Sequence, residues 1–207
     1  MNKDLKQNID GMNVVERALK RSFDFLGALI GLIALSPLFL IIYLMIKKEG
    51  DGPVIYSQER VGKKGKPFRI YKFRTMKVDA EDEGIALSGE GDARLTPQGK
   101  FLREHHLDEL PQLWNVFVGD MSFVGYRPER QYFIDQIMKE NGDYELLYVS
   151  RPGVTSYATL YNGYTDTMEK MLRRLELDLE YLGKRSLLLD TKIIIKTVLS
   201  VVGGRIF

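Results

Sequence analysis

The longest apolar segment of the chain lies near its N-terminus. Residues 25–46 carry no charged side chain and are rich in Leu, Ile, Phe and Gly. As a straight helix these 22 residues would measure roughly 33 Å, which is enough to cross a bilayer core of about 30 Å. The segment is too long for a signal peptide, and no small-residue cleavage site follows it. The pattern therefore predicts a membrane segment.

Two features predict that this segment is bent. Ser36-Pro37 stands at its middle, where proline removes a backbone hydrogen bond and clashes with the preceding turn. The Ser36 hydroxyl is placed to bond a freed carbonyl. Basic residues, which mark the cytoplasmic side of a membrane, flank both ends: Arg17, Lys20 and Arg21 before the segment, Lys47 and Lys48 after it. A re-entrant helix, which enters and leaves the same leaflet, suits both flanks. A single span with a proline kink is the alternative that these residues leave open.

Two amphipathic helices are predicted near the C-terminus. Residues 168–182 place their apolar side chains on one helical stripe and their charged ones opposite. The stripe consists of Met168, Met171, Leu172, Leu175, Leu179 and Leu182, and the opposite face carries Arg173, Glu176 and Glu180. Residues 187–202 are strongly apolar, with Lys192 and Lys196 one turn apart. Such a helix can lie in the membrane interface with its lysines toward the headgroups, and it can also pack on the core of its own domain.

The middle of the chain mixes short strands and short helices. Two β-prone runs, 53–58 and 68–73, are separated by a basic turn and predict a hairpin. Residues 94–103 predict a turn that leads into a short helix. Pro111 suits the first turn of another helix, and Gly119 suits its end. A small hairpin among several helices indicates a helix-rich α+β fold.

Composition narrows the possible functions. The 207 residues are enough for one domain with a real core and too few for two comfortable ones. The net charge of +2 gives no reason to expect nucleic acid as a partner. The absence of cysteine excludes disulfides, thiol catalysis and zinc held by thiolates. An acidic run at 79–83 is expected in a loop.

An adjacent pair of carboxylates, Asp108 and Glu109, is the main candidate for chemistry. It stands just before the predicted helix at Pro111, where free amides and the helix dipole favour anionic groups, phosphate included. Acidic residues in this position often only cap the helix. Here, however, Arg103, Arg127 and Arg130 stand nearby in the sequence. Such a site suits phosphoryl chemistry, in which one carboxylate attacks phosphorus, Mg²⁺ bridges acid and phosphate, and arginines hold the charge.

Several motifs in order resemble those of the bacterial sugar transferases that initiate surface glycans, specifically the small monotopic polyprenol-phosphate phosphoglycosyl transferases. The matching segments are Lys20-Arg-Ser-Phe-Asp24, Ser36-Pro37, Gln58-Glu-Arg-Val-Gly62, Tyr71-Lys-Phe-Arg-Thr-Met76, Leu107-Asp-Glu-Leu-Pro-Gln-Leu113, Gly119-Asp-Met-Ser-Phe-Val-Gly125, Arg127-Pro128, Arg151-Pro-Gly153 and Leu189-Asp-Thr-Lys-Ile193. The resemblance covers the chain from about residue 15 onward.

The resemblance implies a fold and a place in the cell. Residues 1–48 would form an N-terminal tail and a re-entrant membrane helix bent at Ser36-Pro37. Residues 49–207 would form a compact cytosolic catalytic domain with interfacial amphipathic helices. The protein would be monotopic, on the cytoplasmic face of the bacterial inner membrane.

The resemblance also implies a two-step reaction. Asp108 would attack the β-phosphate of a UDP-sugar, release UMP and hold the sugar phosphate covalently. Undecaprenyl phosphate, a polyprenol phosphate, would then attack this intermediate and take the sugar phosphate. Glu109 is expected to bind Mg²⁺ together with Asp108, or to assist the second step.

Further residues are expected to bind the substrates. Arg103, Arg127 and Asp190 match polar positions that the family places around the phosphates and the nucleotide, and Pro128 belongs to the matching Arg-Pro pair. Asp178 falls at the edge of the apolar helical stripe, where a carboxylate is costly unless it has a functional role or a structural partner. Substrate binding and a structural salt bridge or hydrogen bond both stay open for this residue.

One departure from the family concerns a phosphate-binding arginine. Many members have arginine after Asn-Gly, where this chain has Tyr164, and Arg151 or Arg173 could replace it. Tyr126 also stands where members often have proline. These differences affect specificity for the nucleotide and the sugar more than the class of reaction.

Two rival hypotheses lead to other functions. A membrane-anchored phosphohydrolase would use the same aspartate and pass the phosphoryl group to water. A non-enzymatic membrane adaptor would use the Asp108–Glu109 pair only as a helix cap and its basic turns to bind anionic lipid. The interfacial helices could serve a homodimer as well as a membrane. His105-His106 have no third metal ligand nearby in the sequence, so they are expected to pack or hydrogen-bond locally.

Overall fold

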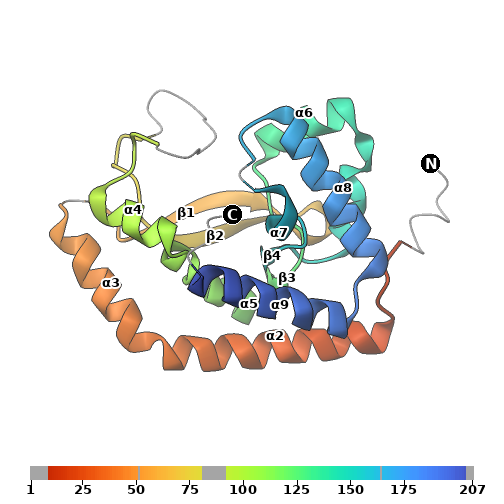
Figure 1. Cartoon of the computed structure of the whole chain (residues 1–207), viewed down its shortest axis with the longest axis horizontal. Coiled ribbons are helices and arrows are strands. Elements are labelled where there is room, and N and C mark those ends of the chain that lie inside the picture. The colour runs from red at the N-terminus through yellow and green to blue at the C-terminus, as the bar shows by residue number, and fades with distance from the viewer. Residues whose placement is uncertain (1–8, 51, 81–91, 164, 204–207) are drawn as a thin grey trace.

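The computed structural model describes residues 9–50, 52–80, 92–163 and 165–203. Tyr164 and residues 81–83 of the acidic run lie outside these ranges. The helices are α2 (Val14–Ala34), α3 (Ser36–Lys48), α4 (Pro97–Glu104), α5 (Gln112–Val118), α6 (Gln131–Glu140), α7 (Thr159–Asn162), α8 (Met168–Lys184) and α9 (Leu187–Val202). The 3-10 turns are η1 (Lys63–Gly65), η2 (Leu107–Glu109) and η3 (Gly142–Val149), and the strands are β1 (Ile55–Val61), β2 (Pro67–Phe73), β3 (Ser122–Val124) and β4 (Gly153–Thr155). The prediction of a helix-rich α+β fold is confirmed (Figure 1).

The predicted bend near the N-terminus is confirmed. α2 starts at a capping box between Asn13 and Glu16 and has Leu35 as its C-cap, and α3 begins at once with Ser36 and Pro37. The two helix axes differ by 60°. The Ser36 hydroxyl donates to the carbonyl of Ile33 at 2.8 Å, as the sequence predicted. Among the described residues no single helix has the length and hydropathy to cross a bilayer, whereas α2 and α3 taken together reach both.

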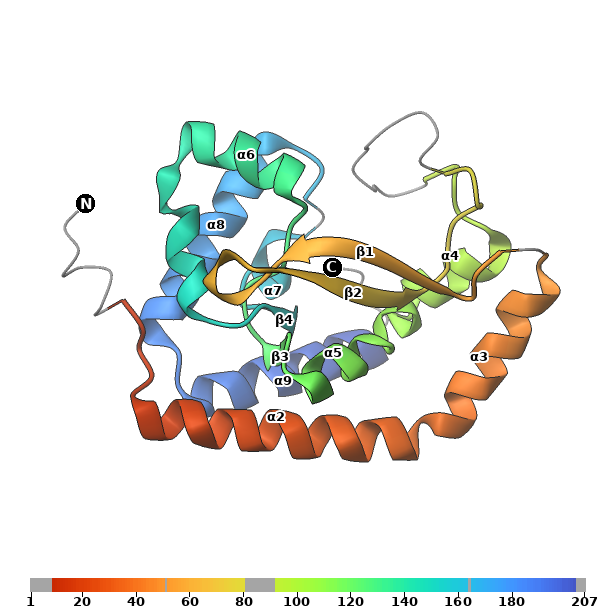
Figure 2. The ribbon, with the colours of Figure 1, turned by 180° about the vertical axis from the view of Figure 1, so that it is seen from behind.

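The bent helix pair packs on the rest of the fold with one face only. Ala28 of α2 is buried against Val116 and Met121, and Ile42 and Ile46 of α3 are buried in a cluster with residues of β2 and α4. The outer face is apolar and exposed, and it comprises Phe23, Leu26, Ile30, Ile33, Leu40, Ile41 and Leu44. α9 lies beside α2 (Figures 1 and 2) and exposes Leu188, Ile195, Val198 and Leu199. The apolar surface therefore extends over α2, α3 and α9.

The predicted hairpin is confirmed, with longer strands than expected. β1 and β2 pair antiparallel from Ile55↔Phe73 to Val61↔Pro67. Lys64 and Gly65 take positive φ angles of 62° and 67° in the basic turn between them. A second pair, β3 and β4, is parallel and was not predicted. This pairing brings the two backbone segments so close that a Cβ on Gly153 would lie 2.1 Å from the backbone nitrogen of Gly125.

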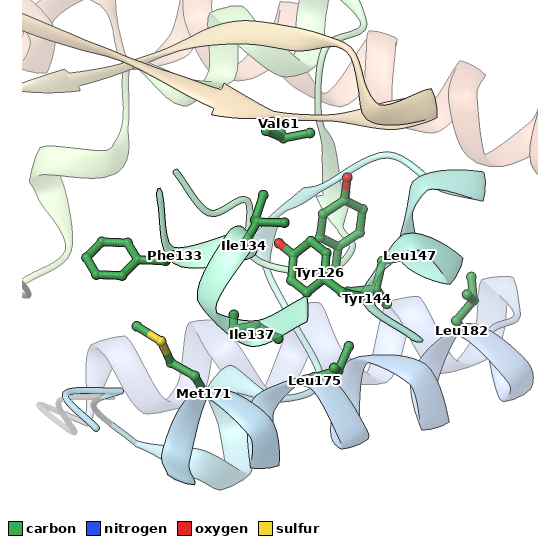
Figure 3. Packing of buried hydrophobic residues seen from close by; sticks show 10 residues of the cluster. All are labelled: Val61, Tyr126, Phe133, Ile134, Ile137, Tyr144, Leu147, Met171, Leu175 and Leu182. Carbon is green, nitrogen blue, oxygen red and sulfur yellow. The ribbon is translucent and has the colours of Figure 1, made fainter. Parts of the chain in front are cut away.

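The largest core lies between α6, η3, α8 and the tip of the hairpin (Figure 3). Its buried members are Val61, Tyr126, Phe133, Ile134, Ile137, Tyr144, Leu147, Met171, Leu175 and Leu182. The predicted apolar stripe of α8 faces this core, and Arg173 and Glu176 lie exposed on the opposite side, as expected. This packing fixes α8 and the segment around Tyr126 as one wall of the cavity described next.

Candidate active site

A cavity of about 580 Å³ opens between the hairpin, η2, α8 and α9. Among the described residues that line it, eight are basic and three are acidic. The basic ones are Arg60, Lys72, Arg74, Lys77, Arg103, Arg127, Arg130 and Arg174, and the acidic ones are Asp108, Glu109 and Glu129. The whole chain has a net charge of only +2, so positive charge is concentrated here. Such a cavity suits a ligand with several negative charges.

The Asp108–Glu109 pair lies in η2, directly before α5, as the sequence predicted. His106 precedes it with a φ of 53°, a left-handed conformation that is uncommon for residues other than glycine. Pro111 precedes α5 without a side-chain cap. The hydrogen bonds of Glu109 go to Lys72 and Arg127, not to the α5 amides. Within the described residues, Glu109 is therefore bonded to basic side chains and not to the helix that follows.

The two carboxyl groups differ in their electrostatic surroundings. Burial alone would raise the pKa of Glu109, but Lys72 and Arg127 hold it well below its usual range. Their nitrogens lie 2.6 Å and 3.4 Å from Glu109 Oε1. Burial, with the added charge of Glu109, raises the pKa of Asp108 to about 6 against the opposing effect of Lys72. One carboxylate is thus ionised at all physiological pH values, and its neighbour titrates near neutrality.

The donor chemistry of this pair fits a magnesium ion that also binds substrate. Among the described residues there is no group of three or more His, Cys, Asp or Glu side chains with metal-ligand geometry. Mg²⁺ at phosphate sites, however, is commonly held by only one or two carboxylates, with the phosphates supplying further oxygens. Asp108 is buried, and a cation beside it would offset the burial that raises its pKa. The residue types of Asp108 and Glu109 thus fit such an ion, and its binding stays a prediction.

Two of the predicted substrate-binding arginines line the same cavity. Arg103, on α4, donates from Nε to the Thr75 hydroxyl at 3.0 Å. Arg127 is ion-paired with Glu109. Pro128 does not line the cavity. Its carbonyl, however, accepts a hydrogen bond of 3.2 Å from Arg60, which is a cavity residue. Tertiary packing therefore gathers Arg103 and Arg127 around the carboxylate pair.

Two further predicted binding residues, Arg151 and Asp190, lie away from the cavity lining. Arg151 donates to the carbonyl of Gly119 at 2.8 Å, beyond the end of α5. Asp190 is ion-paired with Lys20 and accepts a hydrogen bond of 2.6 Å from the Tyr181 hydroxyl, which ties α9 to α2. Both arrangements serve the packing of the fold, and a role in substrate binding stays a prediction for these two residues.

Asp178 is buried behind the cavity wall on α8. Burial raises its pKa to about 7, although the Arg174 charge and the backbone N–H groups of Arg127 and Ala158 lower it. Its carboxylate therefore supports two segments that border the cavity, the one containing Arg127 and the one leading into α7. Its Oδ1 atom, however, is buried and has no hydrogen-bond partner among the described residues, and contact with substrate stays a prediction.

Sequence reasoning missed several cavity residues: Arg60, Lys72, Glu129 and Arg174. Signals for some were present, because Lys72 and Arg60 belong to motifs that resemble the family. Arg173 was considered as a replacement for the family arginine at Tyr164, yet it is exposed and pairs with Glu176 at 2.7 Å. Arg174 lies three residues after Met171 and four before Asp178, so helical spacing places it on the buried side. His105 behaves as predicted, with Nδ1 at 2.9 Å from the carbonyl of Phe101.

Comparison with known proteins places this chain among enzymes. The model of a family described as bacterial sugar transferase matches residues 15–204. The UDP-N-acetylgalactosamine-undecaprenyl-phosphate N-acetylgalactosaminephosphotransferase of Aeromonas hydrophila is 40% identical over 186 residues, 90% of this chain and 44% of that protein. The UDP-glucose:undecaprenyl-phosphate glucose-1-phosphate transferase of Escherichia coli K12 is 42% identical over 186 residues, 89% of this chain and 40% of that protein. The exopolysaccharide production protein PSS of Rhizobium leguminosarum is 37% identical over 195 residues, 90% of this chain and 96% of that protein.

The chain spans less than half the length of the first two relatives and nearly all of the third. The family match, by contrast, runs through almost the entire chain, from α2 to the end of α9. It includes the carboxylate pair and the arginines gathered around it. The chain belongs to the bacterial sugar transferase family.

Proposed function

We propose that the protein transfers a sugar 1-phosphate from a UDP-sugar to undecaprenyl phosphate and releases UMP, as the first membrane step of surface glycan synthesis. The observation that carries this proposal is the Asp108–Glu109 pair in a cavity whose basic residues outnumber its acidic ones by eight to three. A diphosphate substrate matches this charge. The names of the relatives, which act on UDP-sugars and undecaprenyl phosphate, support the same reaction.

The chemistry would proceed in two displacements at one phosphorus atom. The Asp108 carboxylate attacks the β-phosphorus of the UDP-sugar, the bond from this phosphorus to the bridging oxygen breaks, and UMP leaves with the electron pair. The aspartyl sugar-phosphate is then attacked by a phosphate oxygen of undecaprenyl phosphate, which restores the free carboxylate. Lys72, Arg103 and Arg127 offset the negative charge of the phosphates throughout.

Asp108 and Glu109 would hold Mg²⁺ together with oxygens of the diphosphate. When bound, the ion supplies positive charge that neutralises the phosphate oxygens. Glu109 keeps its charge for this purpose because Lys72 and Arg127 keep its pKa low.

The function is tested by UMP release from a panel of UDP-sugars, using purified protein in nanodiscs with Mg²⁺. Continuous release is expected only when undecaprenyl phosphate is present, with one lipid-linked sugar formed for each UMP. Continuous release without the lipid, accompanied by free sugar phosphate, would identify a phosphohydrolase instead. Failure of every UDP-sugar to give lipid-dependent release would contradict the proposal and favour the adaptor hypothesis.

The activity is expected to fall at acid pH because attack requires an ionised Asp108. Because Mg²⁺ would bind together with the diphosphate, kcat/KM for the UDP-sugar reports Asp108 of the free enzyme. With a pKa of about 6 for that carboxyl, kcat/KM should be level above this pH and fall tenfold per unit below it. Lys72→Met removes a cation that lowers this pKa, so the fall should begin at higher pH. Lys100→Met, which changes a lysine that is 72% exposed on α4, is the matched control. An unchanged profile in Lys72→Met would contradict the assignment of this limb to Asp108.

We also propose that α2 and α3 form a re-entrant membrane helix on the cytoplasmic face of the inner membrane. The support comes from their 60° bend, the exposed apolar outer face and the basic residues at both ends. Because the chain has no cysteine, Arg17→Cys and Lys48→Cys each introduce a single reactive thiol. A membrane-impermeant maleimide should label both in inverted membrane vesicles and neither in spheroplasts, with labelling in detergent as the control. Labelling of the two positions from opposite sides would establish a single span.

A further inference from the structure

A second charged cluster lines the cavity and takes no part in the chemistry described so far. It consists of Arg60 on β1, Glu129 in the segment just before α6, and Arg174 on α8. Arg60 Nη1 lies 3.3 Å from Glu129 Oε2, and Arg174 Nη1 is hydrogen-bonded to the other oxygen, Oε1. The three side chains are only 20%, 9% and 15% exposed, respectively. Two guanidinium groups thus share one carboxylate in a largely buried place.

The cluster is held rigidly from several directions. Arg60 also donates to the Pro128 carbonyl at 3.2 Å and to the Gln58 side chain at 2.6 Å. The backbone of Glu129 accepts a hydrogen bond of 3.2 Å from the Val61 amide, which joins it to the hairpin. The helix that carries Arg174 is anchored by Met171 and Leu175 in the largest core. The guanidinium groups are therefore positioned before any ligand arrives.

This arrangement leaves positive charge that the protein itself does not neutralise. Burial lowers the pKa of both Arg60 and Arg174, which means that the fold disfavours their charges there. Glu129 compensates one of the two charges. Asp178 also faces Arg174, but burial raises the pKa of this carboxyl to about 7, so it offsets the second charge only in part near neutral pH. The Nε of Arg60 is also buried and makes no hydrogen bond to any described residue. Buried charges are normally paired, so the cluster calls for an anionic ligand. The planar fork of arginine suits a phosphate group in particular.

The position of the cluster indicates which phosphate it binds. α6 and the start of α8 lie on the side of the hairpin away from α2 (Figure 2). The exposed apolar surface of α2, α3 and α9 lies on the other side, where a lipid-borne phosphate would arrive. A water-soluble substrate would instead approach from the α6 and α8 side. Arg127 lies between the cluster and the carboxylate pair, since it is ion-paired with Glu109 and its pKa is also raised by Glu129.

We propose that Arg60 and Arg174, oriented by Glu129, bind the α-phosphate of the nucleotide sugar, the phosphate that leaves with UMP. This inference rests on the proposed transferase function. The cavity would then hold two phosphate positions. The phosphate to be transferred lies at Asp108, with Lys72, Arg103 and Arg127, and the leaving phosphate lies at Arg60 and Arg174.

The experiment compares Arg174→Gln with Arg173→Gln. The two variants carry the same change at adjacent positions of α8, but Arg173 is exposed and outside the cavity. In a two-step reaction with a covalent intermediate, kcat/KM for each substrate reports its own step. Arg174→Gln should lower kcat/KM for the UDP-sugar by about 10- to 100-fold, the loss expected for a charge-assisted hydrogen bond. It should leave kcat/KM for undecaprenyl phosphate unchanged, and Arg173→Gln should alter neither value.

Calorimetric titration with UMP tests the binding step without turnover. Arg174→Gln should weaken UMP binding by a similar factor, Arg174→Lys by less, and Arg173→Gln not at all. Arg60→Gln provides an independent second variant if Arg174→Gln does not fold. A loss confined to undecaprenyl phosphate would assign the cluster to the lipid phosphate and overturn the proposal, as would equal losses for both substrates or unchanged UMP affinity. UMP binding that depends on Arg174 without any transfer by the wild type would instead count against the proposed function alone.

Discussion

Asp108→Asn is expected to lower UMP release by at least roughly a thousandfold, because removal of a catalytic nucleophile costs several orders of magnitude. The amide has nearly the shape of the carboxylate but lacks the charge and the nucleophilic oxygen. Since Asp108 is buried and its charge is disfavoured there, the uncharged amide should not destabilise the fold. Thermal unfolding of the variant should therefore begin no lower than that of the wild type, while initial rates of UMP release fall.

Asp135→Asn is the matched control for this experiment. Asp135 is an exposed carboxylate on α6 that hydrogen-bonds only to the Gln131 side chain among the described residues. Its replacement should leave the rate of UMP release unchanged. Mass spectrometry of protein incubated with UDP-sugar alone provides a second measurement, because the wild type should gain one sugar phosphate and Asp108→Asn none. Equal rates for Asp108→Asn and the wild type would remove Asp108 from the reaction.

Gly99→Ala is expected to lower activity by about 100-fold, because small displacements of catalytic groups have effects of this size. A Cβ at position 99 would lie 1.9 Å from the carbonyl oxygen of Thr75, so α4 would have to move away from that segment. Arg103 lies one turn further along α4 and is hydrogen-bonded to the Thr75 hydroxyl. The movement would therefore displace Arg103 from the cavity. Overpacking of this kind typically also costs about 1–3 kcal/mol of folding free energy.

Gly142→Ala separates this local effect from a general intolerance of added methyl groups. A Cβ at position 142 meets no atom within 4 Å, and Gly142 is not among the glycines with positive φ. Activity and thermal unfolding temperature should both match the wild type in this variant. Wild-type rates of UMP release in Gly99→Ala would show that close packing of α4 on Thr75 is not needed to position Arg103.

Local patterns in the sequence were sufficient to predict most helices and the hairpin. Proline at position 37 breaks the N-terminal helix, the basic turn closes the hairpin, and Gly119 ends α5 with a φ of 98°. Each of these effects acts within a few residues of its cause, so it can be read without knowing the rest of the fold. The parallel pair β3 and β4 was missed because its three-residue strands are too short for a periodic pattern and pair across a long separation in sequence.

The candidate chemistry was also readable from the sequence, because the adjacent Asp108 and Glu109 and the family motifs are contiguous features. Which basic side chains share the cavity with them depends on the packing of distant segments. Lys72 comes from the hairpin and Arg174 from α8, and the packing of α8 on its core turns Arg174 inward and leaves Arg173 in solvent. The different pKa values of the two carboxyl groups likewise arise from burial and from charges contributed by distant segments. Electrostatic interactions depend on distance in space and on exclusion of water, and neither is set by spacing along the chain.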